Sequence, residues 1–357
     1  MAANKTAVVV GALGVMGRYF VDQLASLPEW QVVGLSRRKG EDRERVKYVS
    51  VDLLDKADAE SKLGSLRDAT HVFFVAFQAP AGAGAAADYA RNVAVNRDLL
   101  VNSVSAIERA SPKLERVVLV TGTKYYGSHL GPFRTPAKET DPRHLGPNYY
   151  FDQIDWLAAR QKGKRWSYTD LRPQTLCGFS PGTAMSIVTV IAVYAAICKE
   201  LGLPLRFPGK PGAYRAIYQV TDSAHMANAA LWAATEARCA NQAYNITNGD
   251  TFRWANLWPR IAEAFEMPWA EPQTISLTSH MADKAPLWDA MVKRHGLKPY
   301  KFAEIAAWPF GDYVFACDWD VMSNVTKSRL HGFHDVVDSE EMFVRLFRQL
   351  RAEKIVP

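Results

Sequence analysis

The stretch Thr6-Ala-Val-Val-Val-Gly-Ala-Leu-Gly-Val-Met-Gly17 decides how the first half of this chain folds. Its apolar start is typical of a buried strand, and residues 18–27 follow with a helical pattern. A glycine turn between a first strand and a helix lets the backbone approach a pyrophosphate, which the helix N-terminus attracts. The spacing Gly-x-x-Gly-x-x-Gly alone would suit any tight turn. The strand before it and the helix after it favour a dinucleotide site.

Short apolar runs alternate with helical patterns through the first half of the chain. We expect strands at 30–35, 46–51, 71–77, 116–120 and 167–171, and helices at 89–110 and 148–162. This alternation predicts an α/β fold, a Rossmann-like doubly wound parallel sheet. After residue 172 the rhythm becomes irregular, and Pro, Trp and Phe become frequent. We therefore divide the chain into a dinucleotide-binding domain at 1–172, to which some later segments return, and a smaller mixed region at 173–357 that mainly binds the substrate.

The end of the second predicted strand indicates which dinucleotide binds. An acidic residue there would bond the ribose 2′-hydroxyl of NAD. This chain instead has Ser36-Arg37-Arg38, and two guanidinium groups suit a 2′-phosphate. We therefore expect NADPH or NADP+, with a solvated basic turn as the alternative. Asp52, after the third strand, is expected beside the adenine, or else it is a simple turn residue.

Composition excludes several other classes of protein. The 357 residues are 48% hydrophobic and 22% charged, as in ordinary globular enzymes. The net charge of +6 comes from scattered Lys and Arg, so we expect no nucleic-acid partner. The four cysteines form no Cys-x-x-Cys pair and have no His cluster beside them, so we expect no metal site and no disulfide. Buried thiols in a reducing compartment fit a cytoplasmic location.

One uncharged stretch, residues 173–198, is long enough to span a bilayer. It contains Pro173, Gly178, Pro181 and Gly182, and its apolar part at 187–198 is too short for a span. No secretory signal precedes the glycine turn. We therefore expect a buried helix beneath the substrate pocket and no membrane partner.

Reductases of this fold commonly carry Tyr-x-x-x-Lys on one helix, which places the phenol and the ammonium on one face. None of the 14 tyrosines here has a lysine four residues later. Either the chain is not catalytic or its lysine comes from elsewhere. Lys124 follows the fifth strand, where ligands bind in open α/β sheets, although an exposed loop charge is the plainer interpretation. The cluster Asn148-Tyr-Tyr-Phe151 opens the next helix, where the usual tyrosine would be; aromatic packing is the alternative.

Several further stretches, taken in order, match a known family. They include Trp30-Gln-Val-Val-Gly-Leu-Ser-Arg-Arg38, Thr121-Gly-Thr-Lys124, Asn148-Tyr-Tyr-Phe-Asp-Gln-Ile-Asp155, Gly178-Phe-Ser-Pro181 and Lys354-Ile-Val-Pro357. With them the chain resembles, over nearly its whole length, the progesterone 5β-reductase and iridoid synthase-like (PRISE) enone reductases. These form a divergent group of the extended short-chain dehydrogenase/reductase superfamily.

The resemblance implies NADPH-dependent 1,4-reduction of an enone or enal, with Tyr150 and Lys124 as catalytic residues. Hydride would go to the β-carbon, Tyr150 would stabilise the enolate oxygen, and Lys124 would assist. The chain departs from the family pattern in three places. Tyr149 replaces a Phe, which makes it a minor rival for the catalytic role, and Phe151 replaces a second Tyr. The stretch from Lys124 to Gly131-Pro-Phe133 is also longer than usual, which alters the loop over the substrate.

These arguments yield two sets of site residues. The cofactor set comprises Gly11, Gly14, Val15, Met16, Gly17, Ser36, Arg37, Arg38, Asp52, Leu53, Ala76, Thr121, Lys124, Tyr150 and Pro173. The substrate set, for a small hydrophobic enone or enal, comprises Phe133, Tyr150, Met185, Trp308 and Phe310. We also expect the small-residue loop 79–87 near the nicotinamide, and the pattern is compatible with a homodimer.

Two other functions stay open at this point. A nucleotide-sugar epimerase or dehydratase of the same extended fold would be expected to carry Tyr-x-x-x-Lys, which is absent. A non-catalytic NADP-binding regulator would typically lose the tyrosine and the lysine, and both can be placed here.

Overall fold

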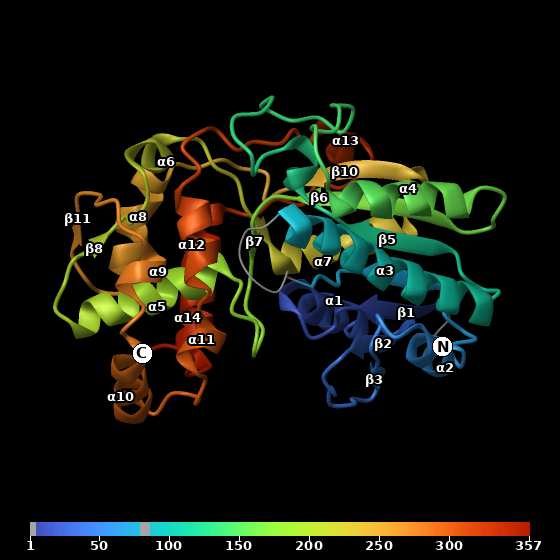
Figure 1. Ribbon diagram of the computed structural model, residues 1–357, viewed down its shortest axis with the longest axis horizontal. Coiled ribbons are helices and arrows are strands. Elements are labelled where there is room, and N and C mark those ends of the chain that lie inside the picture. Colours follow the sequence, from blue (N-terminus) through green and yellow to red (C-terminus); the bar gives the residue numbers. More distant parts are fainter. Residues whose placement is uncertain (1–4, 79–85) are drawn as a thin grey trace.

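The computed structural model describes residues 5–78 and 86–357, as a sheet flanked by helices with a mainly helical part beside it (Figure 1). Most of the small-residue loop expected near the nicotinamide, residues 79–85, lies outside the described residues. Seven strands form one sheet in the order β10 (Gln242–Ile246), β6 (Ser167–Pro173), β5 (Arg116–Val120), β4 (His71–Phe74), β1 (Lys5–Val10), β2 (Trp30–Ser36) and β3 (Val46–Ser50). Every pair of neighbours is parallel. The predicted Rossmann-like parallel sheet is therefore confirmed.

Both faces of this sheet are covered, which explains why β1 is apolar throughout. Ala7 and Val9 belong to a core shared with α1 (Val15–Ala25) and α7 (Ser223–Thr235). Val8 and Val10 belong to the opposite core, shared with α2 (Lys56–Leu63), α3 (Ala86–Ala110) and α4 (Tyr149–Gln161). All four side chains are fully buried. A strand buried on both faces shows no alternation of polar and apolar residues.

The boundaries of several elements differ from those expected from the sequence. Helix α1 begins at Val15 rather than at residue 18, and α2 was not predicted at all. Strand β4 ends at Phe74 rather than at 77, because residues 75–78 leave the sheet and border a pocket instead. An apolar run therefore predicted a longer strand than the one that forms.

The second half of the chain forms its own core and also returns to the sheet. It contains β7 (Leu176–Cys177), α5 (Ile187–Glu200), β8 (Leu205–Arg206), α6 (Pro211–Arg215), β9 (Thr221–Asp222), η2 (Ala237–Cys239), α8 (Trp254–Ala264), β11 (Trp269–Ala270), α9 (Leu277–His280), α10 (Ala285–His295), α11 (Phe302–Ile305), α12 (Trp308–Phe315), α13 (Thr326–Leu330) and α14 (Ser339–Ala352). Strand β10 extends the main sheet, and α7 packs beside α1. The assignment of 173–357 to substrate binding stays a prediction.

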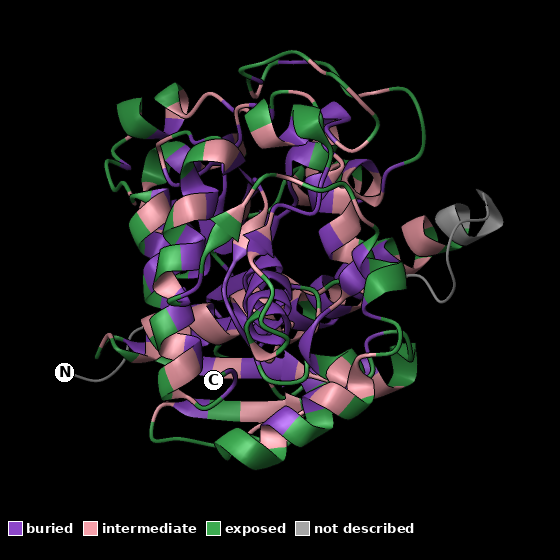
Figure 2. Cartoon of the chain, turned by 90° about the vertical axis from the view of Figure 1, so that its left-hand side faces the viewer, coloured by how far each residue is buried: buried purple, intermediate pink, exposed green. Residues whose placement is uncertain are grey.

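Helix α5 lies at the centre of the second core. Residues 187–198 are all buried, and α12 and α14 pack against the helix. Figure 2 shows buried residues filling the interior and exposed residues on the outer turns of the helices. In the described part of the chain, no helix combines the length and the apolar character that crossing a membrane would require. All four cysteines are buried free thiols.

A buried histidine makes the stability of this fold depend on pH. His71, on β4, is 2% exposed, and its ring packs edge-on against that of Trp30 at a centroid distance of 4.9 Å. Burial, with Lys5 and Arg116 nearby, lowers the pKa of His71 to about 4. An unfolded chain gains this proton as the pH falls below about 6.5, whereas the folded protein does not until about pH 4. The contribution of His71 to the free energy of unfolding is therefore fully present above about pH 6.5. It falls by about 3 kcal/mol as the pH is lowered from 6.5 to 4.

We expect His71→Phe, which keeps an aromatic ring against Trp30, to flatten this part of the stability profile. The free energy of unfolding, measured by urea titration at pH values from 4.5 to 7.5, should fall less steeply than in the wild type. His334→Gln, at an exposed histidine, is the matched control and should keep the wild-type slope. Parallel profiles for His71→Phe and the wild type would show that His71 does not carry the effect.

Candidate active site

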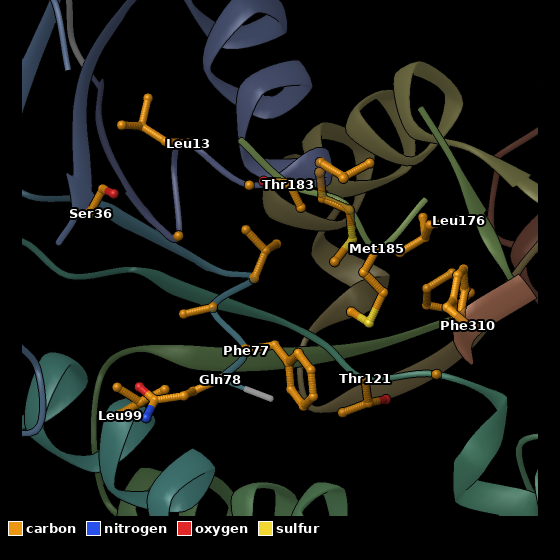
Figure 3. A pocket seen from close by; sticks show the side chains of 18 of the residues that line it. Leu13, Ser36, Phe77, Gln78, Leu99, Thr121, Leu176, Thr183, Met185 and Phe310 are labelled. Carbon is orange, nitrogen blue, oxygen red and sulfur yellow. The ribbon is translucent and has the colours of Figure 1, made fainter. Parts of the chain in front are cut away.

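A pocket of about 820 Å³ lies at the carboxyl ends of the central strands. Its walls come from the turns after β1 to β6, and from residues 174–185 and α12 of the second half. Strands β1 and β4 are neighbours at its centre, where the strand order reverses. Ligands of open α/β sheets bind at such a switch point. Figure 3 shows Phe77, Met185 and Phe310 directed toward the same space.

The glycine turn brings the start of α1 close to this pocket. Gly11 has a φ of +94°, and a Cβ there would lie 2.9 Å from the Ala76 Cα. A Cβ on Gly17 would overlap the Gly11 carbonyl oxygen, so α1 can pack directly on the turn. Gly14 caps α1 without a side chain, and the first turn carries no acid. The helix N-terminus is therefore open to an anion such as a pyrophosphate.

The basic residues after β2 also line the pocket, but they are held differently. Arg38 donates to the carbonyl oxygens of Leu13, at 3.1 Å, and Pro181, at 3.2 Å. It thereby ties the glycine turn to the loop after β7. Arg37 makes one long contact, 3.3 Å from Nη1 to the Gln78 Oε1. Its guanidinium retains most of its donors for a ligand.

Of the two predicted cofactor residues after β3, one borders the pocket and the other stabilises a turn. Leu53 lines the pocket. The Asp52 carboxylate accepts from the Leu54 N–H at 3.0 Å, as a turn residue does. Among the residues that the structure describes, Asp52 and Gly17 are the members of the predicted cofactor set that the lining lacks. Gly17 acts through packing, as described above.

Lys124 lies on η1 (Thr123–Tyr126), directly after β5, and its side chain lines the pocket. Its Nζ lies 5.4 Å from the ring centroid of Tyr313. Part of the side chain is accessible from the pocket, yet the surrounding protein is close enough that burial lowers the lysine pKa. Lys124 is thus an exposed cation whose side chain borders the pocket.

The side chain of Asn148 connects Lys124 to Tyr150. Its Nδ2 donates to the Lys124 carbonyl oxygen at 2.9 Å, and its Oδ1 accepts from the Tyr150 N–H at 3.0 Å as the N-cap of α4. The Tyr150 hydroxyl oxygen lies 3.2 Å from the point where a Cβ on Gly122 would be. The missing side chain of Gly122 therefore leaves room for this phenol beside β5.

The two adjacent tyrosines occupy different places. Tyr150 lines the pocket, whereas Tyr149 stacks on Phe77 at a centroid distance of 5.7 Å. Within the described residues, the lining includes Tyr150 and not Tyr149. The geometry thus favours Tyr150 as the phenol that meets a ligand.

A buried polar network fixes the strand ends beneath these groups. The Thr121 hydroxyl donates to Asp170 at 2.6 Å, and Asp170 pairs with Arg172 at 2.7 Å. Arg172 donates to the Tyr126 hydroxyl at 3.0 Å, which in turn donates to Asn245 at 2.7 Å. Because each partner is paired, the network holds β5, β6 and β10 in fixed register below the pocket.

The predicted substrate residues are only partly brought together. Tyr150, Met185 and Phe310 line the pocket. Trp308 is 8% exposed and packs on Phe302, 5.4 Å between ring centroids, and Phe133 packs against the same second core. Neither appears in the pocket lining within the described part of the chain.

Sequence reasoning missed other lining residues: Phe77, Gln78, Ser128, Gln174, Leu176 and Tyr313. For Tyr313 a signal existed, because Phe310 and Tyr313 are three residues apart and share one helix face. Leu176 lies in the two-residue strand β7, and the others lie in irregular segments, whose course local patterns do not reveal.

Comparison with known proteins agrees with the resemblance. The model of the PRISE-like Rossmann-fold domain matches residues 39–357. The chain belongs to this family. It is 34% identical to the (S)-8-oxocitronellyl enol synthase of Nepeta cataria, covering 99% of this chain and 94% of the relative. It is 32% identical to a short chain dehydrogenase of Penicillium aethiopicum, covering 99% of each chain. The family to which the chain belongs is thus one of oxidoreductases.

Solved structures show the fold alone. The UDP-N-acetylglucosamine 4-epimerase of Methanobrevibacter ruminantium superposes with a TM-score of 0.68 at 16% identity, covering 98% of this chain and 99% of that one. The UDP-glucose 4-epimerase of Thermus thermophilus, solved with NAD, gives a TM-score of 0.65 at 20% identity, covering 96% and 99%. The fold of this chain is therefore similar to that of these two epimerases.

Proposed function

We propose that this protein reduces the C=C bond of activated enones or enals with NADPH. One observation carries the proposal: Lys124 and Tyr150 come from different elements, are joined through Asn148, and border the pocket that starts at the glycine turn. This arrangement supplies a phenol and an ammonium without Tyr-x-x-x-Lys. The relative from Nepeta cataria is named an enol synthase, which suits a reduction that leaves an electron pair on oxygen.

The residues present fit the cofactor. The α1 N-terminus and the glycine turn would hold the pyrophosphate, Arg37 and Arg38 the 2′-phosphate, and the ends of β4 to β6 the nicotinamide. The similar epimerase of Thermus thermophilus was solved with NAD, which supports a nicotinamide cofactor. When bound, the cofactor supplies the hydride that adds to the substrate β-carbon.

The chain's own residues would handle the charge that results. As the β-carbon gains a bond to hydrogen, the alkene electron pair moves through the α-carbon, and negative charge collects on the carbonyl oxygen. The Tyr150 hydroxyl would donate to this oxygen, as an oxyanion hole does. Lys124 would favour the polarised phenol by its charge. A proton added at the α-carbon completes the reduction.

The apolar walls define the substrate class. Phe77, Leu176, Met185 and Phe310 surround the space next to these groups, so we propose a small hydrophobic enone or enal. Hydrophobic contact would hold the body of the substrate while its one carbonyl meets Tyr150.

The test is to mix the protein with NADPH and 2-cyclohexen-1-one and to follow the loss of absorbance at the reduced-cofactor band. We expect turnover and the saturated ketone as product, identified by mass spectrometry. UDP-glucose with NAD is the comparison, because an epimerase would act on it. NADPH binding without turnover of any small enone would support a regulator and overturn the reductase proposal.

A further inference from the structure

The side chain of Lys124 is exposed where it borders the pocket, and its ammonium lies near an aromatic ring. Among the described residues, no side chain or backbone group accepts a hydrogen bond from it, and no carboxylate pairs with it. The group that faces it is the ring of Tyr313, whose centroid is 5.4 Å from Nζ. That distance lies within the range of a cation–π contact.

The Tyr313 ring is held in place from the second half of the protein. It stands on α12, where Phe310 stacks on it at 6.3 Å with the ring planes 26° apart. Between them Gly311 lets α12 approach α5 closely, since a Cβ there would lie 2.7 Å from the Val190 Cγ1. Helix α5 is the buried centre of the second core. The ring therefore has a rigid support.

We propose that Tyr313 is a positioning residue whose aromatic face holds the Lys124 ammonium in place. A residue from the second half of the chain then positions a catalytic group that belongs to the first half. The inference rests on the proposed function of Lys124. Tyr313 also interacts electrostatically with Tyr150, and all three side chains line the same pocket. The pocket therefore receives Lys124 from η1, Tyr150 from α4 and Tyr313 from α12.

The titratable groups around Lys124 allow its protonation to be followed. They are Tyr313, Tyr150, His129 and Cys317. Burial, with Lys124 and His144 nearby, lowers the pKa of His129 to about 4, and burial raises that of Cys317 to about 11. Neither group changes most of its charge between pH 6 and 10.

The experiment compares Tyr313→Phe, which keeps the ring, with Tyr313→Leu, which removes it. The ring favours the charged amine, so its loss should lower the lysine pKa further. We expect Tyr313→Leu to move the alkaline limb of the kcat profile toward neutral pH and to lower kcat at pH 8 by about 3- to 10-fold. Tyr313→Phe should keep the position of the alkaline limb and kcat at pH 8 at their wild-type values. NADPH binding, unchanged within about twofold, would show that each variant is folded.

A second readout does not depend on turnover. Only the neutral amine reacts with formaldehyde and cyanoborohydride, so the rate of reductive methylation of Lys124, mapped by peptide mass spectrometry at pH 8, reports its pKa. Tyr313→Leu should speed this reaction about 3- to 10-fold, and Tyr313→Phe should not. Tyr300→Leu makes the same change at a half-buried tyrosine that, among the described residues, is absent from the pocket lining, so it is the control and should leave the rate unchanged.

Three results would overturn the inference: a wild-type methylation rate in Tyr313→Leu, an equal increase in Tyr300→Leu, or an equal increase in Tyr313→Phe. These outcomes are separate from failure of the proposed function. If no enone is reduced, the methylation rates still decide whether Tyr313 seats Lys124.

Discussion

Replacing Tyr150 with phenylalanine is expected to lower kcat for enone reduction by about 100- to 1,000-fold. That is the cost of removing one preorganised donor from a developing oxyanion. The ring itself stays, so its packing beside Gly122 and its contact with Tyr149 are kept. The NADPH dissociation constant should change by less than about threefold, because the phenol acts on the reacting carbonyl. Steady-state kinetics with 2-cyclohexen-1-one and a fluorescence titration with NADPH measure the two quantities.

Tyr149→Phe is the matched control, because it removes the same atom from the adjacent residue. The stacking of Tyr149 on Phe77 needs only the ring, so this variant should keep kcat within about threefold of the wild type. A large loss in Tyr149→Phe with activity retained in Tyr150→Phe would exchange the roles of the two tyrosines. Activity retained in both would mean that another donor stabilises the enolate oxygen.

The parallel sheet was predictable because local rules decide it. An apolar strand, a glycine turn and a helix follow each other within about twenty residues, and the same alternation recurs up to β6. Spacing alone could not reveal that Lys124 and Tyr150 share a site, because they belong to separate elements. Asn148 brings them together through two hydrogen bonds, one of them to a carbonyl 24 residues away. The resemblance to the PRISE family was what paired Lys124 with Tyr150 as expected catalytic residues.

The substrate side was less predictable because composition does not say which way an aromatic side chain points. Trp308 and Phe310 are two residues apart at the start of α12, yet Trp308 packs into the second core and Phe310 lines the pocket. The face of α12 that meets the pocket depends on how α12 packs against α5, which is a long-range contact. Residues 75–78 illustrate the same limit, since an apolar run suits a pocket wall as well as a strand.

Replacing Arg37 with alanine is expected to weaken NADPH binding by about 10- to 100-fold while changing NADH binding by less than about threefold. A charge-assisted hydrogen bond to a phosphate contributes roughly 1.5–3 kcal/mol, and only NADPH has the 2′-phosphate. Arg37 is suited to this role because its guanidinium makes a single long contact with Gln78. Calorimetric titration of the variant with each cofactor measures the two dissociation constants.

Arg38→Ala should behave differently, because Arg38 already donates to two backbone carbonyls that connect the glycine turn with the loop after β7. Its loss loosens the wall that both cofactors share, so we expect both affinities to fall. Lys39→Ala is the matched control, since Lys39 is exposed and, among the described residues, absent from the pocket lining. It should leave both constants near the wild-type values. An equal loss of NADPH and NADH affinity in Arg37→Ala would show that Arg37 does not sense the 2′-phosphate. A wild type that binds NADH more tightly than NADPH would overturn the choice of cofactor itself.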